Sequence, residues 1–186
     1  MYRCLILLST YNGEKYLPEL LESVLAQKDI YVDILARDDG STDKTVETLK
    51  SYDRVKVYGG NNLKPAKSFL DLIWKADINY DYYALCDQDD VWYPNKLSNA
   101  VKWMQTQKND IPLLYQSKIA IGNSDLSEIV PYKYENYNYN FQKAFTSNIF
   151  FGFAMVINRE LYDRLIRADF DQIKYHDWFA AIIVSA

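Results

Sequence analysis

The feature that most constrains the fold of this chain is the alternation of short apolar runs with helix-patterned segments over its first 107 residues. Four β-type runs, at residues 4–8, 32–36, 54–58 and 80–86, each precede a segment whose apolar residues recur at helical spacing. Such alternation favours parallel neighbouring strands, with the connecting helices on both faces of the sheet. The sequence therefore predicts an α/β, Rossmann-like fold of three layers with a mostly parallel central sheet.

The alternation weakens in the second part of the chain, so that the halves are about 1–107 and 108–186. Residues 111–121 and 151–157 have strand-like composition. The tyrosine- and asparagine-rich segment 132–142 between them is typical of a solvated loop, with a saccharide-facing surface as the alternative. We therefore expect a mixed or antiparallel sheet in this half. The composition of the whole chain, 49% hydrophobic and 25% charged residues, is typical of a single soluble domain.

Local patterns give three further expectations. Ser41 or Thr42 is expected to cap the second helix, because hydroxyl side chains accept hydrogen bonds from first-turn amides. Cys4 and Cys86 lie in apolar runs, which predicts buried free thiols at opposite ends of the sheet. The final segment "WFAAIIVSA" stops without a cap, Gly or Pro, so we expect the polypeptide to continue beyond Ala186.

Composition and missing motifs exclude several classes of function. The formal net charge is −4 and no run of Lys or Arg occurs, which argues against binding to nucleic acid. The longest apolar stretches are shorter than the roughly 20 residues of a membrane-spanning helix, and no signal-peptide cleavage site follows the N-terminus. We therefore expect a cytoplasmic protein. Neither a G-x-G-x-x-G after the first strand nor a P-loop is present, which excludes dinucleotide and P-loop enzymes.

Polar segments follow three of the predicted strands, namely "STYN" at 9–12, "RDDGS" at 37–41 and "DQDD" at 87–90. Because the carboxyl ends of parallel strands share one edge of a sheet, these segments are expected to meet there. They contribute five acids, Asp38, Asp39, Asp87, Asp89 and Asp90. Clustered carboxylates repel one another unless a cation intervenes, and oxygen-only ligands suit Mg²⁺ or Mn²⁺. A metal-bound nucleotide diphosphate fits such an edge.

Each motif alone has a structural interpretation. "DDGSTD" is a common turn before a helix, and Asp89 or Asp90 would favour the start of the following helix through its dipole. Their shared position at strand ends is what favours a binding site. Within it, Tyr11 is suited to stack on a nucleotide base and Asp39 to accept a hydrogen bond from a base N–H.

The segments "STYNGEKYLPELLESVLAQ", "RDDGSTDKT", "DQDDVW" with a following lysine, and "HDWF" resemble the inverting nucleotide-sugar glycosyltransferases of family 2. The resemblance covers most of the chain, and "DQDDVW" with "HDWF" resembles the bacterial rhamnosyltransferase-like branch. It implies the GT-A fold, a nucleotide-diphosphate sugar donor, a Mn²⁺ or Mg²⁺ cofactor and inversion at the anomeric carbon. The two halves of the chain would then be a nucleotide-binding half and an acceptor half.

The resemblance also implies roles for individual residues. Asp177 matches the catalytic base, although a helix-capping role is the structural alternative, and His176 beside it is expected to pack or orient rather than bind a ligand. Arg37 departs from the small or apolar residue that is usual before the acid pair. The matched nucleotide-sugar positions are Ser9, Thr10, Tyr11, Glu14, Asp39, Lys67 and Asp87, and the metal positions are Asp87 and Asp89 of the D-x-D motif, with Asp90 as a further candidate.

The predicted function is metal-dependent transfer of a sugar from a UDP- or dTDP-sugar to a hydroxyl of a surface glycan or lipid-linked saccharide. Such an enzyme of bacterial polysaccharide biosynthesis would work in the cytoplasm, at the inner face of the membrane. Two alternatives stay open: a nucleotide- and metal-binding module without transfer activity, and a metal-dependent nucleotidyltransferase. The first is favoured by the chain end, which lies nine residues after Asp177, where relatives continue with a segment that covers the donor.

Overall fold

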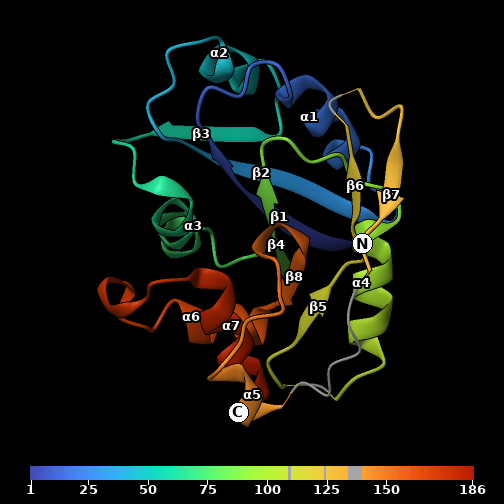
Figure 1. The fold of residues 1–186 in the computed structure, drawn as a ribbon, viewed down its shortest axis with the longest axis vertical. Coiled ribbons are helices and arrows are strands. Elements are labelled where there is room, and N and C mark those ends of the chain that lie inside the picture. The colour runs from blue at the N-terminus through green and yellow to red at the C-terminus, as the bar shows by residue number, and fades with distance from the viewer. Residues whose placement is uncertain (109, 124, 134–139) are drawn as a thin grey trace.

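A six-stranded sheet in the order β3-β2-β1-β4-β8-β5 forms the centre of the computed structural model, which describes residues 1–108, 110–123, 125–133 and 140–186 (Figure 1). Its strands are β1 (Tyr2–Thr10), β2 (Ile30–Asp38), β3 (Val55–Gly59), β4 (Tyr82–Asp87), β5 (Leu114–Gln116) and β8 (Met155–Asn158). The β1–β2, β1–β4 and β2–β3 pairs are parallel, whereas β8 is antiparallel to both β4 and β5. The predicted mostly parallel sheet, mixed in the C-terminal half, is confirmed.

Helices cover both faces of this sheet, as its two cores show. They are α1 (Leu17–Leu25), α2 (Thr45–Lys50), α3 (Lys64–Lys75), α4 (Lys96–Gln105), α5 (Phe141–Ala144), α6 (Arg159–Leu165) and α7 (His176–Ser185), with 3₁₀ turns η1 (Gly152–Ala154) and η2 (Phe170–Gln172). Residues of α1, α2 and α4 pack on one face, and residues of α3, α6 and α7 on the other (Figure 1). The predicted three layers are therefore present.

Strand β1 shows why its sequence is apolar throughout. Cys4 and Ile6 belong to the core under α1 and α4, whereas Leu5 and Leu7 belong to the core under α3. Successive side chains of a strand point to opposite faces, so a strand covered on both sides needs apolar residues at consecutive positions. Both cysteines are buried free thiols, and the register pairs Cys4 with Tyr82 and Cys86 with Leu8, at opposite ends of the sheet as expected.

Local details differ from the expectations in three places. Helix α2 begins only at Thr45, whose amide donates to Asp43 Oδ1 at 3.0 Å, because the Ser41 hydroxyl instead bonds Asp38. The predicted strand 111–121 is divided between β5 and a separate hairpin of β6 (Ala120–Gly122) and β7 (Ile129–Pro131). The predicted strand 151–157 begins with the turn η1. Much of the tyrosine-rich loop, residues 134–139, lies outside the described residues.

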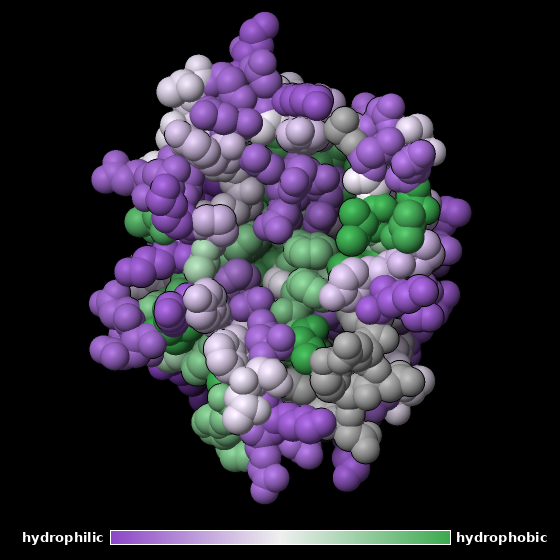
Figure 2. Space-filling model, in the orientation of Figure 1, coloured by the Kyte–Doolittle hydropathy of each residue, from purple (hydrophilic) through white to green (hydrophobic). Residues whose placement is uncertain are grey.

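The β6–β7 hairpin carries exposed apolar side chains, including those of Ile121 and Val130, and its region is one of the most apolar areas of the face in Figure 2.

Among the described residues, no helix is long and apolar enough to cross a bilayer.

Removing apolar volume from the centre of β1 is expected to destabilise the whole fold. We expect Ile6→Ala to lower the free energy of unfolding by about 2–5 kcal/mol, because the fully buried side chain would leave a cavity. Ile121→Ala is the matched control, since this side chain is 62% exposed, and its effect should be within about 0.5 kcal/mol. Urea unfolding measures both values, and equal effects would contradict the assignment of β1 to the core.

Candidate functional site

The three polar segments meet at one edge of the sheet, as the sequence predicts. Strand register pairs Ser9 with Asp87 across β1 and β4, and Thr10 with Asp38 across β1 and β2. The three strands therefore end at the same level. Strand β8 runs in the opposite direction, so the turn η1 before it contacts the same end of β4.

The carboxylate of Asp38 is hydrogen-bonded within the turn that follows β2. Its Oδ2 accepts hydrogen bonds from the amides of Gly40 at 3.1 Å and Ser41 at 2.9 Å, and its Oδ1 accepts one from the Ser41 hydroxyl at 2.5 Å. Gly40 has φ +88°, a conformation that favours glycine. The expectation that all five acids need a cation is therefore wrong for Asp38, whose charge is met by amide and hydroxyl donors.

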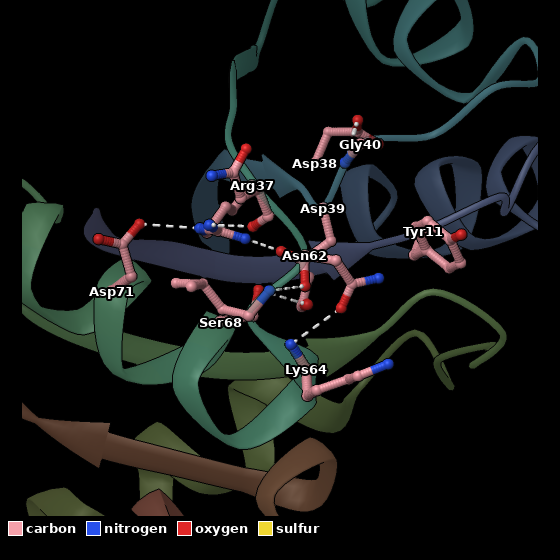
Figure 3. Close-up of polar contacts among 12 residues, drawn as sticks. Tyr11, Arg37, Asp38, Asp39, Gly40, Asn62, Lys64, Ser68 and Asp71 are labelled. Atoms are coloured by element: carbon pink, nitrogen blue, oxygen red, sulfur yellow. Dashed lines mark hydrogen bonds and ion pairs between the residues drawn. The ribbon is translucent and has the colours of Figure 1, made fainter.

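Asp39 is also compensated from within the protein. Its carboxylate forms an ion pair with Arg37, and its Oδ2 accepts a hydrogen bond from the amide of Leu63 at 3.0 Å (Figure 3). Both side chains of the pair are buried, with exposed fractions of 4% for Arg37 and 6% for Asp39. Arg37, which departs from the family pattern, is thus the counterion of Asp39, the acid that the resemblance assigns to nucleotide binding.

Tyr11 presents its ring at this edge through a fixed backbone. The Tyr11 amide donates to Gln88 Oε1 at 2.8 Å, and Gln88 Nε2 donates to the Tyr11 carbonyl at 3.1 Å. The ring itself is 48% exposed, which leaves a face for stacking. A Cβ at Gly13 would collide with the end of the Gln88 side chain, so a larger residue there would displace the amide that holds the Tyr11 backbone. Gln88 was not among the predicted site residues, and only its position between two acids of the motif singles it out.

The other predicted nucleotide-sugar positions lie around this edge in different settings. Ser9 Oγ is 2.7 Å from Ser68 Oγ on α3. The buried Thr10 hydroxyl donates to the Arg37 carbonyl at 3.2 Å. Glu14 Oε2 accepts from the Lys44 amide at 2.7 Å, which links the loop after β1 to the start of α2. Lys67 is exposed on α3. Their contacts to a nucleotide sugar stay predictions.

The end of β4 carries the negative charge that is not balanced by turns or by Arg37. Burial, reinforced by the charge of Asp89 and more weakly that of Asp177, raises the pKa of Asp87 to about 6. Burial also raises the pKa of Asp90 to about 7, against the opposing charge of Lys96. Asp90 Oδ2 is buried and has no hydrogen-bond partner in the described parts of the chain.

Lys96 is the buried cation beneath these acids. Its Nζ donates to the Phe153 carbonyl of η1 at 2.9 Å and lies 3.6 Å from the centroid of the Trp92 ring. Burial lowers the pKa of Lys96 to about 8. The buried Trp92 packs against Lys96 in the first turn of α4. Lys96 therefore joins the acidic loop to the turn that precedes β8.

The acidic loop fits a divalent cation only as a partial site. No group of three His, Cys, Asp or Glu side chains in the described ranges is arranged to hold a metal. Burial nevertheless disfavours the charged forms of Asp87 and Asp90, and Asp90 Oδ2 has no partner in the described residues, so a bound cation would offset this cost. Mg²⁺ and Mn²⁺ suit such a loop, because a few carboxylates suffice when water and substrate phosphates complete the shell.

Asp177 lies in the first turn of α7, at the same edge. Its Oδ2 accepts a hydrogen bond from Asn148 Nδ2 at 3.0 Å, and its Oδ1 accepts one from the Trp178 amide at 2.7 Å. Tyr175 is at the N-cap position, and the bond from the first-turn amide of Trp178 keeps a structural role at the start of α7 as the alternative to that of a base. Strand β4 contacts η1, and His176 at the start of α7 packs against Gly152 of η1, so the fold brings Asp87 and Asp177, 90 residues apart, to one edge of the sheet. No sequence signal pointed to Asn148.

His176 packs rather than binds. Its ring lies 4.7 Å from that of Phe69 on α3, centroid to centroid, and fills the space beside Gly152 that a Cβ would occupy. Neither ring nitrogen has a hydrogen-bond partner among the described residues, and burial lowers the pKa of His176 to about 4. The predicted packing role for this histidine is supported, and Gly152 permits the close approach of α7 to η1.

Comparison with known sequences gives the same assignment as the motifs. The family model described as Glycosyl transferase family 2 matches residues 5–166. The dTDP-rhamnosyl transferase RfbG of Shigella flexneri is 37% identical in an alignment of 106 residues that covers 50% of this chain and 35% of that protein. The UDP-Glc:alpha-D-GlcNAc-diphosphoundecaprenol beta-1,3-glucosyltransferase WfaP of Escherichia coli is 30% identical over 105 residues, 55% of this chain and 41% of that protein. The chain thus spans less than half the length of these curated relatives.

Comparison with solved structures identifies the fold. The crystal structure of S. aureus TarS 1-349 has a TM-score of 0.68 and 21% identity, covering 100% of this chain and 55% of that one. The mannosyltransferase PcManGT from Pyrobaculum calidifontis, in complex with GDP-Man and Mn²⁺, has a TM-score of 0.66 and 16% identity, covering 96% of this chain and 50% of that one. At these identities the likeness concerns the fold, which is the GT-A fold that the resemblance implied.

The buried His176 should make the fold sensitive to acid. Its pKa of about 4 lies below its ordinary 6.5, so the folded state binds fewer protons than the unfolded state between these values. Stability from this group is therefore present above about pH 6.5 and is lost as the pH falls toward 4. Relative to a His176→Leu variant, the unfolding free energy should drop by about 2 kcal/mol between pH 7.5 and pH 5. Denaturant titrations at both pH values measure this, and a constant difference would contradict the burial of a neutral ring.

Proposed function

This chain belongs to glycosyl transferase family 2, and we propose that it transfers a sugar from a nucleotide-diphosphate donor to a hydroxyl group of an acceptor, with inversion. The observation that carries the proposal is the placement of Asp87 and Asp177 at one sheet edge: Asp87 ends β4, which contacts η1, and Asp177 follows His176, which packs against Gly152 of η1. One acid follows a central strand and the other begins α7, so only the tertiary fold joins them. A donor-side acid and an acceptor-side base are the two parts that such a reaction needs.

The nucleotide is proposed to lie across the carboxyl ends of β1, β2 and β4, within the nucleotide-binding half, about 1–107. The exposed ring of Tyr11 would stack on the base, and Asp39 would accept a hydrogen bond from it. Ser9, Thr10, Glu14, Lys67 and Asp87 are proposed to contact the rest of the nucleotide sugar. The acceptor half, about 108–186, supplies Asp177.

The chemical step requires one proton acceptor and one leaving group. As the acceptor oxygen forms a bond to the anomeric carbon, its proton passes to the Asp177 carboxylate. The bond from the anomeric carbon to the diphosphate oxygen breaks on the opposite side, and its electron pair leaves with the nucleotide diphosphate, which inverts the configuration. Asn148 holds one oxygen of Asp177, so the carboxylate meets the acceptor in a defined orientation.

Mn²⁺ or Mg²⁺ is the proposed cofactor. Asp87 and Asp89 of the D-x-D motif would hold it, with Asp90 as the further ligand candidate, and the bound cation would supply positive charge to the diphosphate. The excess of buried negative charge in this loop supports the assignment.

The names of the relatives support a narrower proposal for donor and acceptor. RfbG is described as acting with dTDP-rhamnose, and WfaP with UDP-Glc and a diphosphoundecaprenol acceptor. We therefore propose a UDP- or dTDP-sugar, of hexosyl or rhamnosyl type, and a saccharide or lipid-linked acceptor of a bacterial surface polysaccharide. A lipid-linked acceptor would place the reaction at the inner face of the membrane.

Diphosphate binding tests the donor site. The experiment uses about 1 mM Mn²⁺, which is on the order of the dissociation constants of weak metal sites. Under these conditions a saturating concentration of UDP or dTDP should raise the melting temperature of the protein by several degrees. Asp89→Asn should remove most of this shift, whereas Asp125→Asn, in the exposed β6–β7 loop, should leave it unchanged. No shift with any nucleoside diphosphate would contradict the donor site. Pyrophosphate release from a nucleoside triphosphate would favour a nucleotidyltransferase instead.

Replacing the proposed base separates chemistry from binding. Asp177→Asn should lower the transfer rate by about 10²–10⁴-fold, because the acceptor hydroxyl loses its proton acceptor. Donor affinity should change little, since Asp177 acts on the acceptor. Asp171→Asn, at an exposed position in η2, is the matched control and should retain full activity. Retained transfer by Asp177→Asn, measured with a radiolabelled donor, would remove the assignment of this residue as base.

A further inference from the structure

Arg37 is a buried cation for which the proposed reaction has no direct use. Its side chain is 4% exposed and is engaged on every side. One terminal nitrogen pairs with Asp39, the other donates to the Asn61 carbonyl at 3.0 Å, and Nε donates to Asp71 Oδ2 at 2.9 Å (Figure 3). A guanidinium offers five donors in a rigid plane, so contacts in three directions fix its position.

Asp71 anchors this guanidinium from α3. Besides Arg37, its Oδ2 accepts hydrogen bonds from the Tyr58 hydroxyl at 3.0 Å and from Lys75 Nζ at 3.1 Å. Burial alone would raise the pKa of Asp71, but the bonds from Lys75, Tyr58 and Arg37 outweigh burial and lower it. Asp71 is therefore a carboxylate that holds Arg37 from the side opposite Asp39.

The loop after β3 closes around the same pair. Gly60 leaves the space that Arg37 occupies, since a Cβ there would come within 2.8 Å of the guanidinium. The Leu63 amide donates to Asp39 Oδ2, and Asn61 accepts from Arg37. Each carboxylate oxygen of Asp39 thus has one partner within the protein. A carboxylate has about four acceptor positions, so Asp39 has capacity for further hydrogen bonds, and because its Oδ1 is fully buried beside Arg37, Oδ2 is the oxygen that a ligand would meet.

We propose that Arg37 is a positioning residue of the nucleotide-base subsite, which fixes Asp39 so that its remaining acceptor positions select a base with a donor N–H at its recognition edge. This inference rests on the proposed function, because it assumes that Asp39 meets the base. It adds that the selectivity depends on a chain from α3 through Asp71 and Arg37 to Asp39. An imide base, such as uracil or thymine, offers the N–H that Asp39 requires.

A cytosine base provides the contrast. Its ring nitrogen at the same position accepts rather than donates, so it would face a fixed carboxylate acceptor to acceptor. Sites built to hydrogen-bond one partner reject an analogue that lacks the matching group, because buried polar groups are left unpaired. A carboxylate free to rotate would discriminate less, since it could turn away from the wrong base.

The test compares UDP and CDP on the whole chain, with Mn²⁺ present, by isothermal titration calorimetry. The wild type should bind UDP at least about tenfold more tightly than CDP. Arg37→Met should weaken UDP binding by about tenfold or more and bring the ratio close to one, with CDP affinity little changed. Asp71→Asn retains both Asp39 and Arg37 but weakens the anchor of the guanidinium, so it should reduce the UDP to CDP affinity ratio to an intermediate value. It keeps the test decisive if Arg37→Met fails to fold, which circular dichroism would show.

Arg159→Met is the matched control, because Arg159 forms an Arg–Asp ion pair with Asp163 on α6, at 2.8 Å, and donates to the Ile78 carbonyl, and both partners lie outside β2 and α3. It should retain the UDP to CDP ratio of the wild type. A UDP to CDP affinity ratio equal to that of the wild type, in folded Arg37→Met or in Asp71→Asn, would overturn the inference. Equal weakening of UDP and CDP binding would also overturn it. If the wild type bound neither diphosphate, the proposed function itself would fail, which is a different outcome.

Discussion

The parallel pairing of β1 with both β2 and β4 is the constraint on which the rest of this structure depends. It places Ser9 beside Asp87 and Thr10 beside Asp38, so that three loops leave the sheet at one level. That pairing is possible only because β1 is apolar at consecutive positions and is buried under helices on both faces. The antiparallel β8 then brings η1, and α7 beyond it, to the same edge.

Charge is distributed at this edge in two distinct ways. Asp38 and Asp39 are balanced within the protein, the first by the amides and hydroxyl of its own turn and the second by Arg37. In the loop after β4, the buried Lys96 is the cation that opposes the charges of three acids within the described part of the chain, and burial raises the pKa values of Asp87 and Asp90. The excess of negative charge is thus confined to the part of the site where a cation and a diphosphate are proposed to bind. The compensated acids instead act as fixed hydrogen-bond acceptors.

The regular elements and the meeting of three polar segments at one sheet edge were largely predictable from the chain, whereas the partners of the side chains there were not. The continuous apolar run of β1, which suits a strand covered on both faces, and the helical spacing in α1 and α3 predicted the layers, because both patterns reflect local geometry. Contacts such as Gln88 with the Tyr11 backbone and Asn148 with Asp177 join residues 77 and 29 positions apart. Such contacts follow from packing, and a single sequence carries no signal for them. The expected cap of α2 was wrong for a related reason, since Ser41 has a stronger local partner in Asp38.

The sequence by itself determined the α/β architecture, the family and the acids that stand at strand ends, because apolar periodicity and motif spacing are properties of neighbouring residues. Only the tertiary structure decided which of those acids already have hydrogen-bond or ion-pair partners within the protein. Burial and hydrogen bonding depend on what other elements bring to the same place: Arg37 and the Leu63 amide to Asp39, Lys96 to Asp90, and Asn148 to Asp177. Arg37 shows the difference most clearly. In the sequence it is a departure from the family pattern, and in the fold it is the counterion that holds Asp39 in place, because β2, the loop after β3 and α3 converge on its guanidinium.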